Sequence, residues 1–224
     1  MSARSVTWDR VLSDLPLIAI LRGVTPTQAV PVAEALYNSG FLCVEVPLNS
    51  PAPFESIGAI RARFNESLMT GAGTVLSASD VKSSLSSGAQ LIVSPHTDPE
   101  VIQATREAGL ISLPGCATPG EAFNAHRLGA HALKLFPAEA MPASVVRALK
   151  AVLPSHLPLL PVGGITPQTI AAYRAAGAAG FGIGSAIYSP GSTPDQVHER
   201  ATAFVRAWRD ACRSEVDGSA GHTN

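Results

Sequence analysis

A repeated pattern of glycine turns and short apolar runs constrains the fold of this chain more than any other feature. The turns lie at Gly40, Gly88, Gly109, Gly129 and Gly177, and an apolar run follows each of them at once. Three of these glycines are separated by 21 and 20 residues, and the two wider gaps of 48 residues leave room for two units each. A glycine at such a point typically ends a helix. Short strands alternating with helices at this spacing predict βα units and a parallel sheet.

Further apolar runs at residues 17–21, 67–70 and 157–162 bring the number of predicted strands to eight. Most predicted helices begin at or beside a proline that follows Thr or Ser, as at Thr118-Pro119, which is typical of a capped first turn. The predicted helices cover residues 26–39, 51–64, 78–87, 99–108, 119–128, 142–152, 167–176 and 194–213.

Eight βα units in a chain of 224 residues predict a single-domain (β/α)8 TIM barrel. The barrel is expected over residues 15–213, after an N-terminal segment of residues 1–14 and before a frayed polar tail of residues 214–224. The alternative is a doubly wound sheet, but no G-x-G-x-x-G sequence follows the first strand, which weakens a dinucleotide site.

Composition excludes several classes of function. The net charge is −1 and no basic stripe is present, so we expect no nucleic-acid partner. The apolar run at residues 15–21 is too short to span a bilayer, so we expect no membrane partner. The three cysteines, Cys43, Cys116 and Cys212, form no C-x-x-C pair and predict a cytoplasmic protein without disulfides.

Lys134 lies in the middle of the apolar run His131-Ala132-Leu133-Lys134-Leu135-Phe136-Pro137, which has the length of one buried strand. The other two lysines, Lys82 and Lys150, lie in polar stretches with a helical pattern. Burial lowers the pKa of a lysine, and a neutral amine can attack a ketone to form a Schiff base. The alternative is a structural lysine that reaches an acidic partner.

Polar residues gather where the predicted strands end, which is the edge of a barrel that carries the chemistry. Glu45 is a carboxylate in an apolar strand, and could either move protons or pair with Lys134 or Arg22. Arg22, after the first strand, could bind a carboxylate or phosphate or form a salt bridge at the rim. Thr74 follows the third strand and could bind substrate or cap a helix, and Pro95 follows the fourth.

Two glycine-containing loops follow the last two strands, at Gly163-Gly164 and at Gly184-Ser185. Backbone N–H groups in such loops, with the helix predicted from Pro167, can bind an anion, and barrels often bind phosphate here. The alternative is that these glycines serve only tight turns. We expect no metal, since His96 has no second histidine or carboxylate pair at ligand spacing.

With these residues in place, the chain resembles the class I KDPG/KHG aldolase family over nearly all of residues 16–213. The resemblance implies a (β/α)8 barrel, a homotrimer, and neither metal nor cofactor. It makes Lys134 the Schiff-base lysine and Glu45 the proton-transferring group. It places the pyruvate portion against Arg22 and Thr74, and the phosphate at the two glycine loops. It rests on residues 18–23, 44–51, 71–76, 134–138 and 162–165.

The implied reaction is the reversible cleavage of a phosphorylated 2-keto-3-deoxy acid to pyruvate and D-glyceraldehyde 3-phosphate. Asn49 and Val162 are similar to the branch that acts on 2-dehydro-3-deoxy-6-phosphogalactonate, because the gluconate branch typically has an arginine near Asn49 and a threonine at Val162. Alternative substrates are 2-dehydro-3-deoxy-6-phosphogluconate and 4-hydroxy-2-oxoglutarate. Two further alternatives lack Schiff-base chemistry: a phosphosugar isomerase or epimerase, and a barrel that only binds phosphorylated acids.

Overall fold

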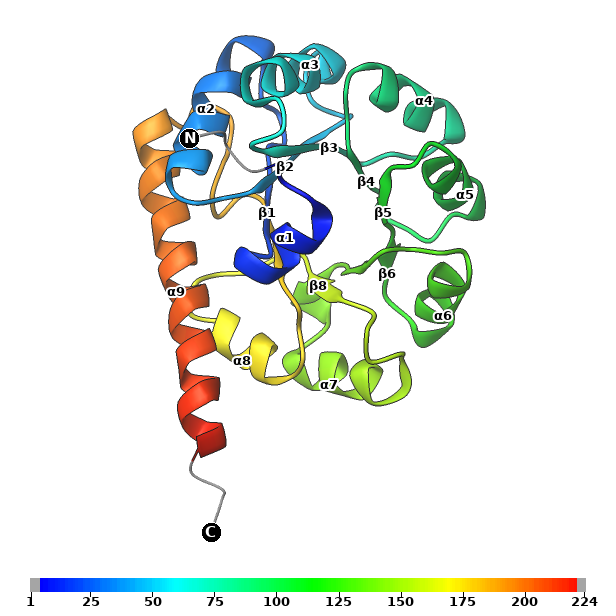
Figure 1. The fold of residues 1–224 in the computed structure, drawn as a ribbon, viewed down its shortest axis with the longest axis vertical. Helices are drawn as coiled ribbons and strands as arrows, with labels where there is room; N and C mark the ends of the chain where they lie inside the picture. Colours follow the sequence, from blue (N-terminus) through cyan, green and yellow to red (C-terminus); the bar gives the residue numbers. More distant parts are fainter. Residues whose placement is uncertain (1–4, 221–224) are drawn as a thin grey trace.

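The computed structural model describes residues 5–220 of the chain, with side chains described up to residue 213. Parallel strands form the centre of the molecule and helices surround them (Figure 1). The strands are β1 (Leu17–Ile20), β2 (Cys43–Pro47), β3 (Met69–Gly73), β4 (Leu91–Val93), β5 (Ile111–Leu113), β6 (Gly115–Cys116), β7 (Leu133–Leu135), β8 (Leu159–Pro161) and β9 (Phe181–Ile183). The helices are α1 (Trp8–Asp14), α2 (Pro26–Asn38), α3 (Pro53–Phe64), α4 (Ala78–Ser86), α5 (Pro99–Glu107), α6 (Pro119–Arg127), α7 (Ala143–Val152), α8 (Ile170–Ala175) and α9 (Pro194–Ala220), with a 3-10 turn, η1 (Ala138–Ala140).

The strands form a curled parallel sheet. Six strands pair in the order β5-β4-β3-β2-β1-β9, and β6-β7-β8 form a second group of three. A single bridge between Val162 and Gly182 links the end of β8 to β9. Strands that follow one another along the chain are mostly neighbours in space, whereas a doubly wound sheet reverses its strand order at a switch point. The doubly wound alternative is therefore wrong for the described strands.

The repeat that predicts the βα units is confirmed by the backbone. All five repeat glycines have a positive φ, between 70° and 103°, at the point where a helix gives way to the next strand. Most predicted helix boundaries lie within two residues of those observed. At the start of α6, the Thr118 hydroxyl accepts a hydrogen bond from the Glu121 N–H, and the Glu121 carboxylate accepts one from the Thr118 N–H.

Three predicted element boundaries differ from those observed. α3 begins at Pro53 rather than at residue 51, because the Ser50 hydroxyl accepts a hydrogen bond from the Gly23 N–H instead of capping the helix. α8 begins at Ile170 rather than at residue 167, so the glycine loop before it leads into a turn. β3 begins and ends later than predicted and includes Gly71 and Gly73, which sequence alone assigns to a loop.

The C-terminal helix is longer than predicted. α9 is helical as far as Ala220, seven residues past its predicted end, so the described part of the tail is not frayed. A helix that has already formed adds one hydrogen bond for each residue it extends, which favours this continuation. The remainder of the predicted tail, residues 221–224, lies outside the described residues. Among the described residues, none of the helices has both the length and the apolar character needed to cross a membrane.

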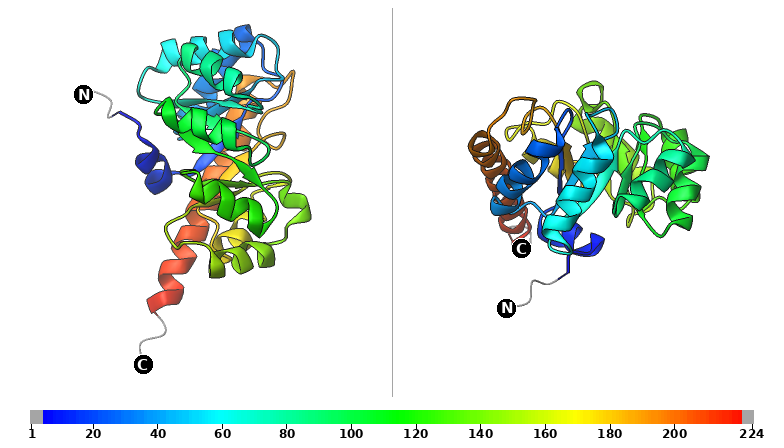
Figure 2. Two further views of the ribbon diagram at one scale, coloured as in Figure 1. Left: turned by 90° about the vertical axis from the view of Figure 1, so that its right-hand side faces the viewer. Right: turned by 90° about the horizontal axis from the view of Figure 1, so that it is seen from above.

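The predicted N-terminal segment contains a helix that covers one end of the sheet. Thr7 caps α1 by accepting a hydrogen bond from the Arg10 N–H. Figure 2 shows this helix lying against one side of the molecule. Trp8 and Val11 are buried in a cluster of inward-facing strand residues. The strand residues of this cluster are Ile18, Cys43, Met69, Leu91, Val93, Leu113 and Leu160. α1 therefore closes the end of the core opposite the carboxyl ends of the strands.

Replacing Trp8 with Ala is expected to lower the free energy of unfolding by about 3 kcal/mol or more, because a large side chain that is 7% exposed leaves a cavity. Urea denaturation monitored by far-UV circular dichroism would measure the change. Ser13→Ala, an exposed position of the same helix, is the control, and should change the free energy by less than about 0.5 kcal/mol. Equal stability of the two variants would show that α1 does not close the core.

Candidate active site

Lys134 lies in the middle of β7, between Gly115 of β6 and Leu160 of β8. Its side chain is 4% exposed. Among the described residues no carboxylate comes within ion-pair distance of Nζ, and this nitrogen instead lies 4.7 Å from the centre of the Phe136 ring. Burial lowers the pKa of Lys134, Glu45 opposes this shift, and the positive charge of Arg22 adds to it. The structural alternative, a lysine tied up in an ion pair, is therefore not what the described residues show.

Glu45 is the central residue of β2, paired with Ile20 of β1 and Gly71 of β3. It is 2% exposed, and its Oε2 atom has no hydrogen-bond partner among the described residues. Burial raises the pKa of Glu45 from its ordinary value of 4.5 to about 7, although the charges of Lys134 and Arg22 pull it down. A buried carboxylate without a partner is costly, and such groups are concentrated at functional sites.

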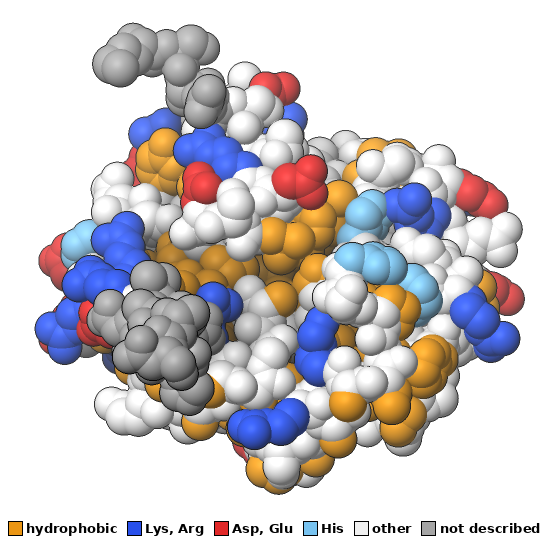
Figure 3. Space-filling view, turned by 60° about the horizontal axis from the view of Figure 1, so that its bottom comes forward, with side chains coloured by type: hydrophobic (Ala, Val, Ile, Leu, Met, Phe, Trp, Pro, Cys, Tyr) orange, Lys and Arg blue, Asp and Glu red, His pale blue; other side chains and the backbone are white. Residues whose placement is uncertain are grey.

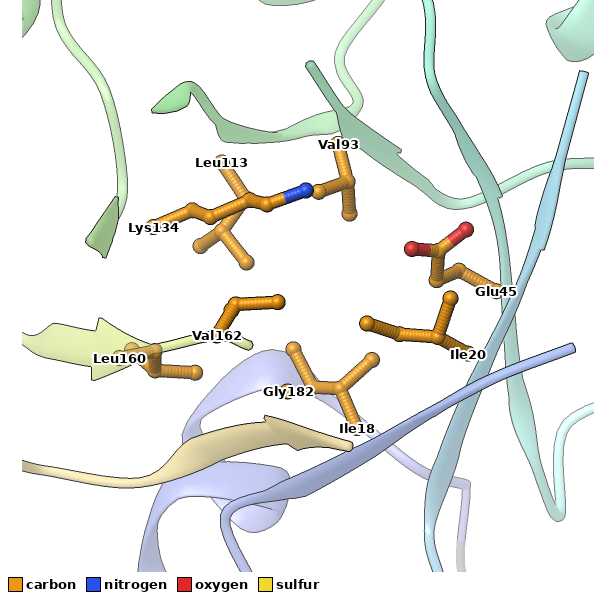
Figure 4. Close-up of a pocket in the computed structure, with 9 residues that line it drawn as sticks. All are labelled: Ile18, Ile20, Glu45, Val93, Leu113, Lys134, Leu160, Val162 and Gly182. Atoms are coloured by element: carbon orange, nitrogen blue, oxygen red, sulfur yellow. The ribbon is translucent and has the colours of Figure 1, made fainter. Parts of the chain in front are cut away.

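The Lys134 and Glu45 side chains enter one cavity from different walls (Figure 4). The rest of the lining is almost wholly aliphatic and consists of Ile18, Ile20, Val93, Leu113, Leu160, Val162 and Gly182. The apolar walls exclude water and so disfavour the charged form of both groups. The pKa of the Lys134 amine is lowered and the pKa of the Glu45 carboxyl is raised. Burial therefore favours the neutral amine of Lys134 and the protonated carboxyl of Glu45, which are the forms that a nucleophile and a proton donor need.

Gly73 of β3 shapes the space around the carboxylate, and the residue after it has an unusual backbone conformation. A Cβ atom added to Gly73 would overlap the Glu45 carboxyl group, so the absence of a side chain lets Glu45 lie against the β3 backbone. The next residue, Thr74, has a φ of 54°. This left-handed conformation is strained for a β-branched residue, and strain of this kind is concentrated at functional sites.

Replacing Gly73 with Ala is expected to push the Glu45 carboxylate out of the cavity. We expect kcat to fall by about 10²-fold and the free energy of unfolding to fall by about 1–3 kcal/mol. Gly120→Ala is the matched control, because nothing lies within 4 Å of the added Cβ and the position is in the first turn of α6. Steady-state kinetics and urea denaturation of both variants test this, and wild-type kcat in Gly73→Ala would contradict it.

A larger opening lies next to the Lys134 cavity and has a volume of about 830 Å³. Ile20, Val162 and Gly182 line both spaces, so the opening lies directly beside the cavity that contains the amine and the carboxylate. Five residues predicted from strand ends line it together: Arg22, Gly163, Gly164, Gly184 and Ser185. The structure thus brings the buried pair and the two glycine loops to one side of the sheet.

Arg22 is held by the loop that follows β2. Its guanidinium NH1 donates a hydrogen bond of 2.7 Å to Asn49 Oδ1. The next N–H along the chain, from Gly23, donates one of 2.9 Å to Ser50 Oγ. These two bonds join the loops after β1 and β2 and place the guanidinium beside the opening. On the face shown in Figure 3, several Lys and Arg side chains lie together at the left edge, and the others lie singly among other residues.

Two predicted site residues lie at the same edge of the sheet but do not line either space. Thr74 directly follows β3, and Pro95 follows β4 after Ser94. Three residues that sequence alone does not single out do line the larger opening: Phe136, Glu139 and Tyr188. Phe136 and Glu139 come within five residues of Lys134, so closeness to the end of its strand is the signal that could have identified them.

The fold and the site define a class: an α/β protein with a buried amine and carboxylate at the carboxyl edge of a curled parallel sheet. The family model described as KDPG and KHG aldolase matches residues 8–200. The chain belongs to this family.

Named relatives lie within the same family. The chain is 46% identical to the 2-dehydro-3-deoxy-6-phosphogalactonate aldolase of Escherichia coli (strain K12), over 88% of this chain and 96% of that protein. It is 42% identical to a probable 2-dehydro-3-deoxy-6-phosphogalactonate aldolase of Rhizobium meliloti (strain 1021), over 86% and 91%. A solved structure described as native KDPGal superposes with a TM-score of 0.88 at 45% identity, covering 90% of this chain and 98% of that chain.

Proposed function

We propose that this protein is a class I aldolase that cleaves 2-dehydro-3-deoxy-6-phosphogalactonate to pyruvate and D-glyceraldehyde 3-phosphate. The buried side chains of Lys134 and Glu45, which enter one apolar cavity beside a larger opening, give the main support for this activity. The two relatives at 46% and 42% identity bear the name of this activity.

The chemistry follows from the two shifted pKa values. The neutral Lys134 amine attacks the C2 ketone, and Glu45 supplies the proton with which the carbinolamine loses water to give an iminium ion. The C3–C4 bond then breaks, its electrons form an enamine, and the C4 hydroxyl loses its proton as the aldehyde leaves. Protonation at C3 regenerates the iminium, and water releases pyruvate and the free amine. Glu45, whose pKa is about 7, can both accept and donate protons in these steps.

The opening suggests how the two ends of the substrate are bound. Arg22, held by Asn49, faces the opening and is positioned to bind the carboxylate of the pyruvate portion. Thr74 and Pro95, at the ends of β3 and β4, complete this part of the site. The phosphate is assigned to Gly163, Gly164, Gly184 and Ser185. Gly163 and Gly164 have φ values of 110° and 63°, and successive N–H groups in such turns form anion-binding concavities.

Val162 supports the assignment of the galactonate rather than the gluconate as the substrate. It lines both the Lys134 cavity and the larger opening, so it contacts the middle of a substrate that extends from one to the other. An apolar side chain here, with Asn49 in place of an arginine, favours the galactonate configuration at C4. The alternative substrate, 2-dehydro-3-deoxy-6-phosphogluconate, is supported by more distant relatives, such as one of 34% identity named for phosphogluconate cleavage.

The strand pairing supports closure of the sheet into a (β/α)8 barrel. β5 and β6 are separated only by Pro114, so they count as one strand that pairs with β4 on one side and with β7 on the other. The bridge between Val162 and Gly182 joins β8 to β9 and would complete the circle. We further propose a homotrimer, as the family resemblance implies, working in the cytoplasm, where the three free cysteines would stay reduced.

Trapping with borohydride tests the proposed chemistry. The protein is incubated with pyruvate and sodium borohydride, and intact mass and peptide mapping are measured. One reduced pyruvate on Lys134 is the expected result. A folded protein without an adduct would instead favour an isomerase, an epimerase or a phosphate-binding barrel. Comparison of kcat/KM for the two C4 epimers then tests the substrate, and we expect a preference for the galactonate form.

A further inference from the structure

The glycine pair assigned to the phosphate is already faced by a negative charge. A Cβ atom added to Gly163 would overlap Oε2 of Glu139 and lie 2.9 Å from its Cδ. A Cβ added to Gly164 would lie 2.6 Å from Cγ of Glu139 and 3.2 Å from its Cδ. The carboxyl group of Glu139 therefore fills the space directly over both glycines.

Glu139 reaches this place because its backbone is fixed on two sides. It is the middle residue of η1, which follows Lys134 and Phe136 along the chain. The Ala138 N–H donates a hydrogen bond of 2.9 Å to the carbonyl of Val162, just before the glycine pair. The Tyr173 hydroxyl lies 3.1 Å and 3.0 Å from the carbonyl oxygens of Ala138 and Met141, and donates to this turn from α8. The turn is therefore tied to both elements that flank the glycine loop.

The side chain itself is not tied down. Among the described residues, the Glu139 carboxylate forms no hydrogen bond or ion pair, and the residue is exposed at the larger opening. A carboxylate held only by the position of its backbone can rotate away into solvent. The backbone of Glu139 is therefore fixed, whereas its carboxylate can move toward or away from the glycine loop below it.

We propose that Glu139 is a specificity-determining residue that occupies the anion site over Gly163 and Gly164 when the site is empty and moves aside when a phosphate enters. The inference rests on the proposed function, in which these glycines hold the substrate phosphate. The negative charge of Glu139 weakens the binding of free inorganic phosphate, because inorganic phosphate makes no contacts elsewhere that could offset the cost of displacing the carboxylate. The phosphorylated substrate is held at its other end as well, by Lys134 and Arg22, so it displaces the carboxylate more readily.

The test is the affinity for inorganic phosphate, measured by isothermal titration calorimetry on wild-type protein and on Glu139→Gln. Gln keeps the size of the side chain and removes its charge. We expect phosphate to bind Glu139→Gln about tenfold more tightly, as expected for removing one charge several ångströms from a dianion in partly hydrated surroundings. Glu107→Gln removes the same charge from the last residue of α5, at the opposite end of the sheet, and should leave phosphate affinity unchanged.

Kinetics separate this role from a purely structural one. In Glu139→Gln, KM for the phosphorylated substrate should fall severalfold, while KM for the same sugar acid without phosphate and kcat for both stay at wild-type values. Unchanged or weaker phosphate binding in Glu139→Gln would overturn the inference, and so would an equal change in KM for the two substrates.

Trapping with pyruvate keeps this inference distinct from the proposed function. Pyruvate has no phosphate, so its adduct at Lys134 should form at the same rate in wild type and in Glu139→Gln. No adduct in either protein means that the aldolase proposal fails. A normal adduct together with wild-type phosphate affinity in Glu139→Gln means that only the role of Glu139 fails.

Discussion

Lys134→Ala is expected to abolish aldol cleavage, with kcat reduced by at least about 10⁴-fold, because no other amine of the described residues lies in the cavity to form the iminium ion. The protein should stay folded. Lys134 is 4% exposed, and its amine has no ion-pair partner among the described residues, so removing this buried polar group relieves a desolvation cost that offsets part of the lost packing.

The measurement combines turnover, borohydride trapping with pyruvate, and circular dichroism. Lys134→Met retains most of the side-chain volume and should be equally inactive, which separates loss of the amine from loss of packing. Lys82→Ala, at an exposed position of α4, is the matched control and should retain wild-type activity and the full adduct mass. Appreciable cleavage by a folded Lys134→Ala protein would remove the Schiff base from the mechanism.

Glu45→Gln is expected to lower kcat by about 10²–10⁴-fold, the usual contribution of a positioned acid or base, with little change in KM. The amide fills the same space in the cavity and still accepts hydrogen bonds, but it cannot exchange a proton with the carbinolamine or the enamine. Steady-state kinetics on the cleavage reaction measure the effect. A raised KM with unchanged kcat would identify Glu45 as a binding residue instead.

The same substitution should change how stability depends on pH. Because burial raises the pKa of Glu45 from 4.5 to about 7, the folded protein holds more protons than the unfolded chain between these values. The free energy of unfolding therefore falls as pH rises through this window. Glu45→Gln lacks this decline, and should gain about 3 kcal/mol relative to wild type between pH 4 and pH 8. Urea denaturation across this range measures it, and parallel curves for the two proteins would contradict the buried-charge interpretation.

Much of the fold could be predicted because its signals are local. Gly88, for example, has a φ of 90° at the end of a helix, a conformation that favours glycine and therefore marks the helix end in the sequence. The apolar run that follows such a glycine is typical of a buried strand. Lys134 and Glu45 could be identified in the same way, since a charged residue inside an apolar strand is conspicuous in the sequence. The family resemblance added their roles and the substrate class.

Other features could not be predicted because they depend on partners that are distant in the sequence. Ser50 precedes a proline like a helix cap, but its hydroxyl binds the Gly23 N–H, 27 residues earlier. The sequence around Gly73 is typical of a loop, but Gly73 lies in β3. There the carboxyl group of Glu45, from the neighbouring strand, occupies the space that a side chain at position 73 would fill. Trp8 covers the end of the core only because strands from the whole chain assemble above it.

Local patterns in the amino-acid sequence are enough to predict the alternation of strands and helices, the apolar strands that contain Lys134 and Glu45, and the glycine loops at the strand ends. These properties follow from backbone conformation and hydrophobic spacing, which act over a few residues. Only the folded chain shows that the amine and the carboxylate share one cavity, that Asn49 accepts a hydrogen bond from Arg22, and that the carboxylate of Glu139 lies over Gly163 and Gly164. Burial and Coulomb interactions depend on distance in space, so these relations arise only when the strands are brought together.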